Sequence, residues 1–228
     1  MNKIPVVAID GPVGSGKGTI ARQVANALGW NLLDSGALYR LVGLASAKRG
    51  ITEAGEDALS ELAAGLSVRF DSDQSGDERI FLEDEDVTAD VRTEECGRLA
   101  SFVASLPGVR AALLDLQKGF RQEPGLVADG RDMGSTVFPD AVLKVYLTAS
   151  ARERAIRRHK QLKDKGIDVS LPALSRDIED RDRRDSERTI APLKTADDAR
   201  LLDSSGQSIE EVTQTVLGWV AKLEKGTV

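Results

Sequence analysis

The chain has 228 residues, a formal net charge of −6 and a pI near 5.0. That length allows one substantial hydrophobic core, with room for an inserted subdomain. The acidic balance argues against nucleic-acid binding as the main activity, although local arginine clusters can still bind small anions. Cys96 is the only cysteine, which excludes an intrachain disulfide and fits a reducing compartment. With no signal-peptide pattern and no apolar stretch of membrane-spanning length, the sequence favours a cytoplasmic enzyme without a membrane partner.

The first predicted element is a strand that leads through a glycine-rich loop into a helix. An apolar run at residues 5–10 is followed by GPVGSGKGT at residues 11–19, and then by apolar positions at helical spacing to Leu28. Glycines let the backbone curl around a phosphate with its N–H groups inward, while the helix N-terminus and Lys17 add positive charge. The spacing G-x-x-x-x-G-K in this context is the phosphate-binding P-loop pattern.

Position 18 departs from the usual form of that pattern. Ser or Thr normally follows the lysine, whereas here Gly18 stands in that place and Thr19 comes next. This G-K-G-T variant resembles nucleoside monophosphate kinases more than GTPases or large ATPases. We therefore rank Lys17 above Thr19 as a functional residue, and direct binding of Mg²⁺ by a P-loop hydroxyl is left open.

The rest of the chain alternates between strands and helices. Further core strands are predicted at residues 30–33, 126–128, 142–147 and 200–203, and helices at residues 34–49, 93–106, 109–120, 151–162, 171–185 and 208–223. Two half-exposed strands at 66–70 and 79–82 flank a turn-like segment at 71–76, which indicates an acidic antiparallel insert. Five apolar strands alternating with helices predict an α/β fold, with a parallel sheet covered by helices on both faces.

The loop after the third core strand is a candidate site. It reads Asp-Gly-Arg-Asp-Met-Gly over residues 129–134. In an open parallel sheet the carboxyl ends of the strands face the ligand crevice, so Arg131 and Asp132 are expected beside a substrate. The alternative is a salt bridge between neighbours within the loop.

A charged segment near the end of a predicted helix is a second candidate. Arg181, Asp185 and Arg188 are spaced i, i+4 and i+7 and would form one stripe on a helix. Guanidinium groups match phosphate or sugar oxygens, and a carboxylate accepts from a ribose hydroxyl. The alternative is a solvated helix face.

A basic stretch around Gly166 has two interpretations, a mobile cationic flap over a triphosphate or an exposed basic helix. Its cations are Arg152, Arg154, Arg157, Arg158, Lys160, Lys163 and Lys165. His159, the only histidine, is expected at the surface, and Cys96 is expected as a small buried apolar side chain.

Four segments together carry a specific resemblance. GPVGSGKGT at 11–19, LDSGALYR at 33–40, ADGRDMG at 128–134 and the charged pattern from Arg181 to Pro192 resemble the bacterial cytidylate kinases, nearly from end to end. The resemblance implies a P-loop NTPase fold with an inserted monophosphate-binding subdomain and a small lid. It also implies phosphorylation of CMP and dCMP by ATP through direct in-line transfer. The alternative is a nucleoside monophosphate kinase of broader pyrimidine specificity, for UMP and CMP.

The resemblance also implies roles for individual residues. ATP is expected to contact Gly11, Pro12, Val13, Gly14, Ser15, Gly16, Lys17, Gly18, Thr19 and Arg157. For CMP, it implies Ser35, Ser101, Arg110 and Asp132 around cytosine, Arg40, Arg131 and Arg188 around the acceptor phosphate, and Arg181 with Asp185 at the sugar. Lys17, Arg131 and Arg188 are the expected catalytic residues. Mg²⁺ is expected to enter with ATP, without a dedicated all-protein site.

The expected organisation is a core interrupted twice. Core segments are expected at 1–61, 106–153 and 169–228, the strands of the insert at 62–92 with helices extending to about residue 105, and the lid at 154–168. The chain is expected to act as a monomer. A nucleotide-switch protein is the alternative from another class, but its guanine-specificity pattern N-K-x-D is absent from the sequence.

Overall fold

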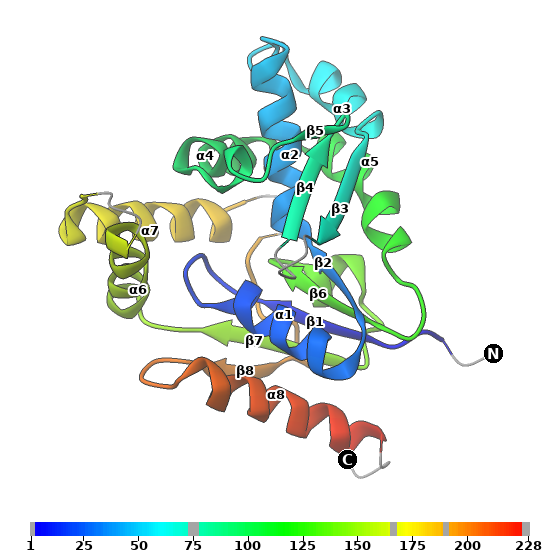
Figure 1. Cartoon of the computed structure of the whole chain (residues 1–228), viewed down its shortest axis with the longest axis vertical. Helices are drawn as coiled ribbons and strands as arrows, with labels where there is room; N and C mark the ends of the chain where they lie inside the picture. Colours follow the sequence, from blue (N-terminus) through cyan, green and yellow to red (C-terminus); the bar gives the residue numbers. More distant parts are fainter. Residues whose placement is uncertain (1–2, 73–77, 165–167, 189–191, 225–228) are drawn as a thin grey trace. The chain divides into compact units, whose positions relative to one another are not determined.

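The computed structural model describes residues 3–72, 78–164, 168–188 and 192–224. Its main sheet has five strands in the order β2-β6-β1-β7-β8, flanked by helices (Figure 1). These strands are β1 (Val6–Asp10), β2 (Asn31–Asp34), β6 (Leu126–Gly130), β7 (Leu143–Thr148) and β8 (Arg200–Asp203). Strand β1 pairs in parallel with β6 and β7, and β7 pairs in parallel with β8. The predicted α/β class and its five core strands are confirmed.

The apolar strands explain where the core lies. Every residue of β1 and β6 is buried, as expected for parallel strands that are covered on both faces. Helices α1 (Lys17–Leu28) and α8 (Ile209–Glu224) contact each other and share one apolar cluster with the sheet, in which Val24 and Val216 meet Val7 and Val145. The charged helices α6 (Ala151–Asp164) and α7 (Leu171–Ser186) follow β7 and pack together.

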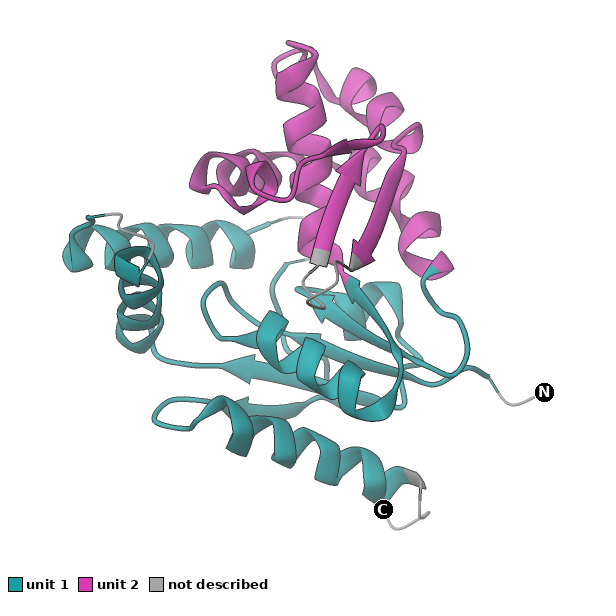
Figure 2. Cartoon of the chain, in the orientation of Figure 1, with its two compact units in different colours: residues 1–33, 120–228 teal, residues 34–119 magenta. Residues whose placement is uncertain are grey.

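The chain divides into two compact units (Figure 2). The first unit contains residues 1–33 and 120–228, and the second contains residues 34–119. The second unit is made of α2 (Ser35–Lys48), α3 (Glu56–Ala64), an antiparallel sheet of β3 (Val68–Ser72), β4 (Glu78–Leu82) and β5 (Glu85–Asp86), the turn η1 (Asp90–Arg92), α4 (Glu94–Val103) and α5 (Pro107–Gly119). Within this unit α2 packs on α4 and α3 packs on α5.

Several local predictions are confirmed in detail. The helix predicted at 34–49 is present as α2, which the Asp34 side chain caps by accepting from the Ala37 N–H at 3.0 Å, and α1 ends at Leu28, as its apolar spacing predicted. The predicted strands β3 and β4 pair antiparallel, with Val68 opposite Leu82. Residues 73–77 of the expected turn, and Lys165 and Gly166 of the expected break, lie outside the described residues.

Four elements have no counterpart in the sequence analysis: α3, β5, the turn η1 and the short helical turn η2 (Met133–Val137). A further difference concerns the expected Arg181 stripe. Helix α7 ends at Ser186, so Arg188 lies beyond the helix and does not continue its face. Among the described residues no single helix is long and apolar enough to cross a membrane, although α4 and α5, bent by 102°, together reach that threshold by length and composition.

Candidate active site

The P-loop connects β1 to α1 through a backbone that requires glycine. Gly16 precedes the first residue of α1 and has φ of 90°, in the left-handed region that other residues adopt at a cost. Gly11 allows a close approach, because a Cβ there would lie 2.0 Å from the Leu147 carbonyl oxygen. The loop is therefore shaped by β7 as well as by its own sequence.

Lys17 lies at the start of α1, beside a carboxylate from the neighbouring strand. Its Nζ is 3.8 Å from Asp129 Oδ1, and the two side chains are 13% and 7% exposed. A Cβ at position 18 would lie 3.2 Å from Asp129 Oδ2, which is a tight contact. The Asp129 carboxylate thus occupies the space into which a Ser or Thr at position 18 would project.

The loop after β6 is held by β1. Both Asp10 carboxylate oxygens accept backbone hydrogen bonds, from the N–H of Met133 and the N–H of Gly134, each at 2.8 Å. Burial raises the pKa of Asp10 from 3.8 to about 6, and the two N–H donors offset only part of that effect. Asp132 immediately precedes the two donors and is 3% exposed.

Arg131 contacts the charged segment at the end of α7. Its Nε donates to Asp185 Oδ2 at 3.1 Å, so the ion pair spans 54 residues and is not one between loop neighbours. Arg188 donates to the other oxygen, Oδ1, at 2.6 Å. Asp185 is 2% exposed, and although burial raises its pKa, the charges of Arg131, Arg188 and Arg181 hold that pKa below the usual value. Arg131 and Arg188 therefore donate to one buried carboxylate, and the charge of Arg181 also stabilises its ionised form.

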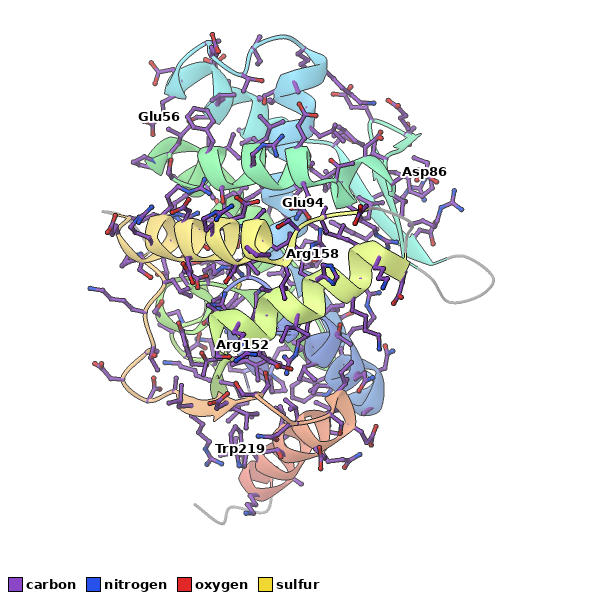
Figure 3. All side chains as sticks on the ribbon, turned by 90° about the vertical axis from the view of Figure 1, so that its left-hand side faces the viewer. Glu56, Asp86, Glu94, Arg152, Arg158 and Trp219 are labelled. Atoms are coloured by element: carbon purple, nitrogen blue, oxygen red, sulfur yellow. The ribbon has the colours of Figure 1, made fainter. Side chains whose placement is uncertain are left out.

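Helix α6 brings two arginines to the P-loop. Arg157 donates to the Ser15 carbonyl at 3.3 Å and to the Ser204 hydroxyl at 3.1 Å. Arg154 is buried and donates to the Val13 carbonyl at 2.9 Å and to Asp182 on α7 at 3.0 Å. The basic stretch is therefore not uniformly exposed. Figure 3 shows Arg152 and Arg158 on the same helix, where Arg152 is exposed, while His159, expected at the surface, is half-buried.

Four predicted CMP contacts lie in the second unit and are described within it. Arg40 on α2 donates to the carbonyls of Val91 at 2.6 Å and Thr93 at 2.9 Å, which hold its guanidinium against the start of α4. Ser101 on α4 and Ser35 on α2 are buried. Arg110 on α5 donates to the Ala104 carbonyl at 3.3 Å and lies over the Tyr39 ring, with 5.6 Å from its guanidinium carbon to the ring centroid.

Asp10, Asp129 and Ser204 were not among the predicted site residues, and Arg154 was predicted only as part of a basic stretch. The signal for the two aspartates was present, because each is an acidic residue at the carboxyl end of an apolar strand. The strand pairing brings them together, since Asp10 lies opposite Gly130 and Ile9 lies opposite Asp129. Within the described ranges, no three His, Cys, Asp or Glu side chains form a cluster that could hold a metal ion by themselves.

Comparison with known proteins bears on both the family and the fold. A family model described as cytidylate kinase matches residues 7–222. A cytidylate kinase of Methylococcus capsulatus is 58% identical over 217 residues, which cover 95% of this chain and 97% of that protein. One of Pseudomonas paraeruginosa is 59% identical over 215 residues, or 94% of each chain. A crystal structure of an uncharacterised protein from Eubacterium ventriosum, 10% identical with a TM-score of 0.53, covers 96% of this chain and 99% of its own, and it supports the fold alone.

The family model spans all five core strands, the P-loop and the charged segment after α7, and the two bacterial relatives are similar over almost the whole chain. The chain therefore belongs to the cytidylate kinase family of nucleotide kinases.

Proposed function

We propose that this chain transfers the γ-phosphoryl group of ATP to the phosphate of CMP and dCMP. The observation that carries the proposal is the pairing of β1 with β6, which sets the P-loop beside the loop of Arg131 and Asp132. The P-loop and the loop of Arg131 and Asp132 thus begin at adjacent strand ends of one sheet, where ligands bind in folds of this class. The 58% and 59% identity to cytidylate kinases supports CMP as the acceptor.

Positioning and charge neutralisation account for the catalysis in this proposal. The attacking oxygen belongs to a phosphate that is already ionised at neutral pH, so the reaction requires no general base. Lys17 and the P-loop N–H groups face the phosphates of ATP, and Arg131 and Arg188 neutralise the acceptor phosphate and the transferring group. Because Asp185 holds both arginines from opposite oxygens, their charges are oriented before substrate arrives.

Acceptor recognition completes the proposed site. Asp132, Ser35, Ser101 and Arg110 bind cytosine, Arg40 binds the acceptor phosphate with the arginines above, and Arg181 with Asp185 binds the sugar. An ionised carboxylate has only acceptors, so Asp132 can receive the 4-amino group of cytosine but opposes the 4-carbonyl of uracil. Arg157 contributes to the ATP side, which its hydrogen bond to Ser15 supports.

The residues around Lys17 fit a Mg²⁺ ion that enters with ATP. Mg²⁺ prefers oxygen ligands and is usually held by one or two carboxylates together with substrate phosphates and water. Asp129 offers a buried carboxylate at the base of the P-loop, and Thr19 offers a hydroxyl one residue beyond Gly18. When bound, Mg²⁺ neutralises charge on the phosphates of ATP.

The proposal also includes a monomeric chain in the cytoplasm. In it, the insert and the lid near 154–168 close over the two nucleotides.

A coupled assay of ADP release tests this function. We expect release to require both Mg²⁺ and a monophosphate, with CMP and dCMP far ahead of UMP, AMP and shikimate in kcat/KM. ATP hydrolysis that is vigorous and unaffected by any acceptor would contradict a kinase. Equal turnover of UMP and CMP would instead support the broader pyrimidine kinase, which is the second candidate.

A further inference from the structure

Asp10 is a buried carboxylate in a place where a carboxylate is costly. It is the last residue of β1, directly before Gly11 of the P-loop, and it is 7% exposed. Burial of an ionised carboxylate is strongly unfavourable unless its oxygens receive hydrogen bonds or an ion pair. No contact with ATP or CMP is proposed for Asp10, so a carboxylate at this position requires another explanation.

The two side-chain hydrogen bonds of Asp10 both come from one short segment. Its two oxygens accept from the consecutive N–H groups of Met133 and Gly134, at 2.8 Å each. Two adjacent backbone donors can both reach one carboxylate only when the backbone between them has a defined conformation. Asp10 therefore fixes the two peptide units that follow Asp132.

The first of these two peptide units is held at its carbonyl end as well. The Asp132 carbonyl accepts from the N–H of Thr136 at 2.9 Å and of Val137 at 3.2 Å, which closes the turn η2. Asp10 and the turn η2 therefore hold the backbone directly after Asp132. Arg131, one residue earlier, is held by Asp185.

We propose that Asp10 is the positioning residue for base selection: it holds the loop of residues 130–134 so that Asp132 presents its carboxylate to cytosine. This inference rests on the proposed function, since it assumes that Asp132 contacts the base. Because Asp10 directly precedes the P-loop, it also connects the acceptor loop to the loop that binds ATP.

The test compares CMP with UMP as acceptors for the wild type, Asp10→Asn, Asp132→Ala and the control Asp140→Asn. Asparagine keeps the shape and one acceptor oxygen of Asp10, but its amide group meets the second backbone N–H with a donor. We expect Asp10→Asn to raise KM for CMP and to reduce the CMP-to-UMP ratio of kcat/KM by about tenfold, with KM for ATP nearly unchanged. Asp140, partly exposed and paired with Lys3 and Arg121, should give wild-type values when replaced.

The variants separate the positioning role of Asp10 from the recognition of cytosine by Asp132. A reduced ratio in Asp132→Ala together with an unchanged ratio in Asp10→Asn would overturn the role of Asp10 alone. An unchanged ratio in Asp132→Ala would show that Asp132 does not read the base, and the inference would fail with that part of the proposed function. A fall in kcat for both acceptors, with the ratio and KM unchanged in Asp10→Asn, would indicate a merely structural role and would also overturn it.

The pH dependence of the same ratio provides a second readout. Protonation of Asp10 removes one acceptor, as the asparagine does, and the charged or titratable groups that face it are Asp132, Arg131 and Tyr146. The second ionisation of the acceptor phosphate is common to CMP and UMP and cancels in their ratio. We expect the wild-type ratio to fall as the pH drops from 8 through about 6, and the ratio of Asp10→Asn to stay level. A slope that persists in Asp10→Asn would overturn the inference. If that variant does not fold, the wild type decides, and a level ratio overturns it.

Discussion

Lys17 and Asp129 illustrate how single residues at this site depend on each other. The Nζ of Lys17 lies 3.8 Å from Asp129 Oδ1, and both side chains are largely buried. A buried charge that loses its partner destabilises the fold, so the pair has a structural role beside the catalytic role proposed for Lys17. The two roles can be separated by experiment.

We expect Lys17→Met to lower kcat by about a hundredfold or more, because it removes one preorganised charge from the transferring phosphoryl group. It should also lower the Tm, since Asp129 loses a cation. Adding Asp129→Asn should restore much of the Tm without restoring activity, as measured by calorimetry and by ADP release. Lys48→Met is the control, because Lys48 is exposed and pairs only with Glu85 among its described ion pairs. Near-normal turnover of Lys17→Met would remove Lys17 from the mechanism.

At the scale of elements, the packing of α2 on α4 determines how Arg40 is held. The guanidinium of Arg40 donates to the carbonyls of Val91 and Thr93, which lie just before α4. It also lies against Gly97 inside that helix. A Cβ at position 97 would be 3.0 Å from Arg40 Nη2 and 3.5 Å from its central carbon. The two hydrogen bonds restrict how far the guanidinium can shift. Gly97 is therefore the residue that leaves space for this side chain.

Gly97→Ala should raise KM for CMP severalfold and leave KM for ATP unchanged, because Arg40 must move from its carbonyl partners. On helix propensity alone, Gly97→Ala would gain up to about 1 kcal/mol of stability. Gly218→Ala is the matched control, since position 218 lies in α8 and a Cβ there would have nothing within 4 Å. That variant should gain stability with no change in KM. A Gly97→Ala enzyme with wild-type KM for CMP would show that Arg40 is not a phosphate ligand.

At the scale of the whole molecule, the proposed nucleotide contacts are divided between the two compact units. The P-loop, Arg131, Asp132, Arg181 and Arg188 belong to the first unit, and Ser35, Arg40, Ser101 and Arg110 belong to the second. On these assignments, CMP orders residues in both units, whereas ATP acts mainly on the first.

Hydrogen exchange distinguishes these effects. We expect a non-hydrolysable ATP analogue to protect residues 11–19, and CMP to protect residues 130–134 and residues 93–110 of the second unit. Helix α8 carries none of the proposed contacts and serves as the internal control. Protection by CMP that is confined to the first unit would contradict the roles of Arg40, Ser101 and Arg110.

Features with local causes could be predicted from the sequence. The P-loop needs a run of glycines and a lysine at fixed spacing, the five core strands are continuous apolar runs, and the cap of α2 needs only Asp34 three residues before its donor. Helix α3 had such a signal in Leu59, Leu62 and Ala63 at helical spacing. It is only nine residues long, and its packing on α5 supplies the stability that so short a helix lacks by itself.

The sequence by itself therefore determined the fold class and the family, and it predicted the charged residues that are proposed to contact phosphate. The tertiary structure decided which of those residues meet. The strand order and register bring Asp10 to the N–H groups of Met133 and Gly134, more than 120 residues away along the chain. The packing of α7 places Asp185 between Arg131 and Arg188, although Arg188 lies beyond the helix end. No local pattern encodes these contacts, because each depends on the positions of two distant segments, which the burial of the whole sheet sets together.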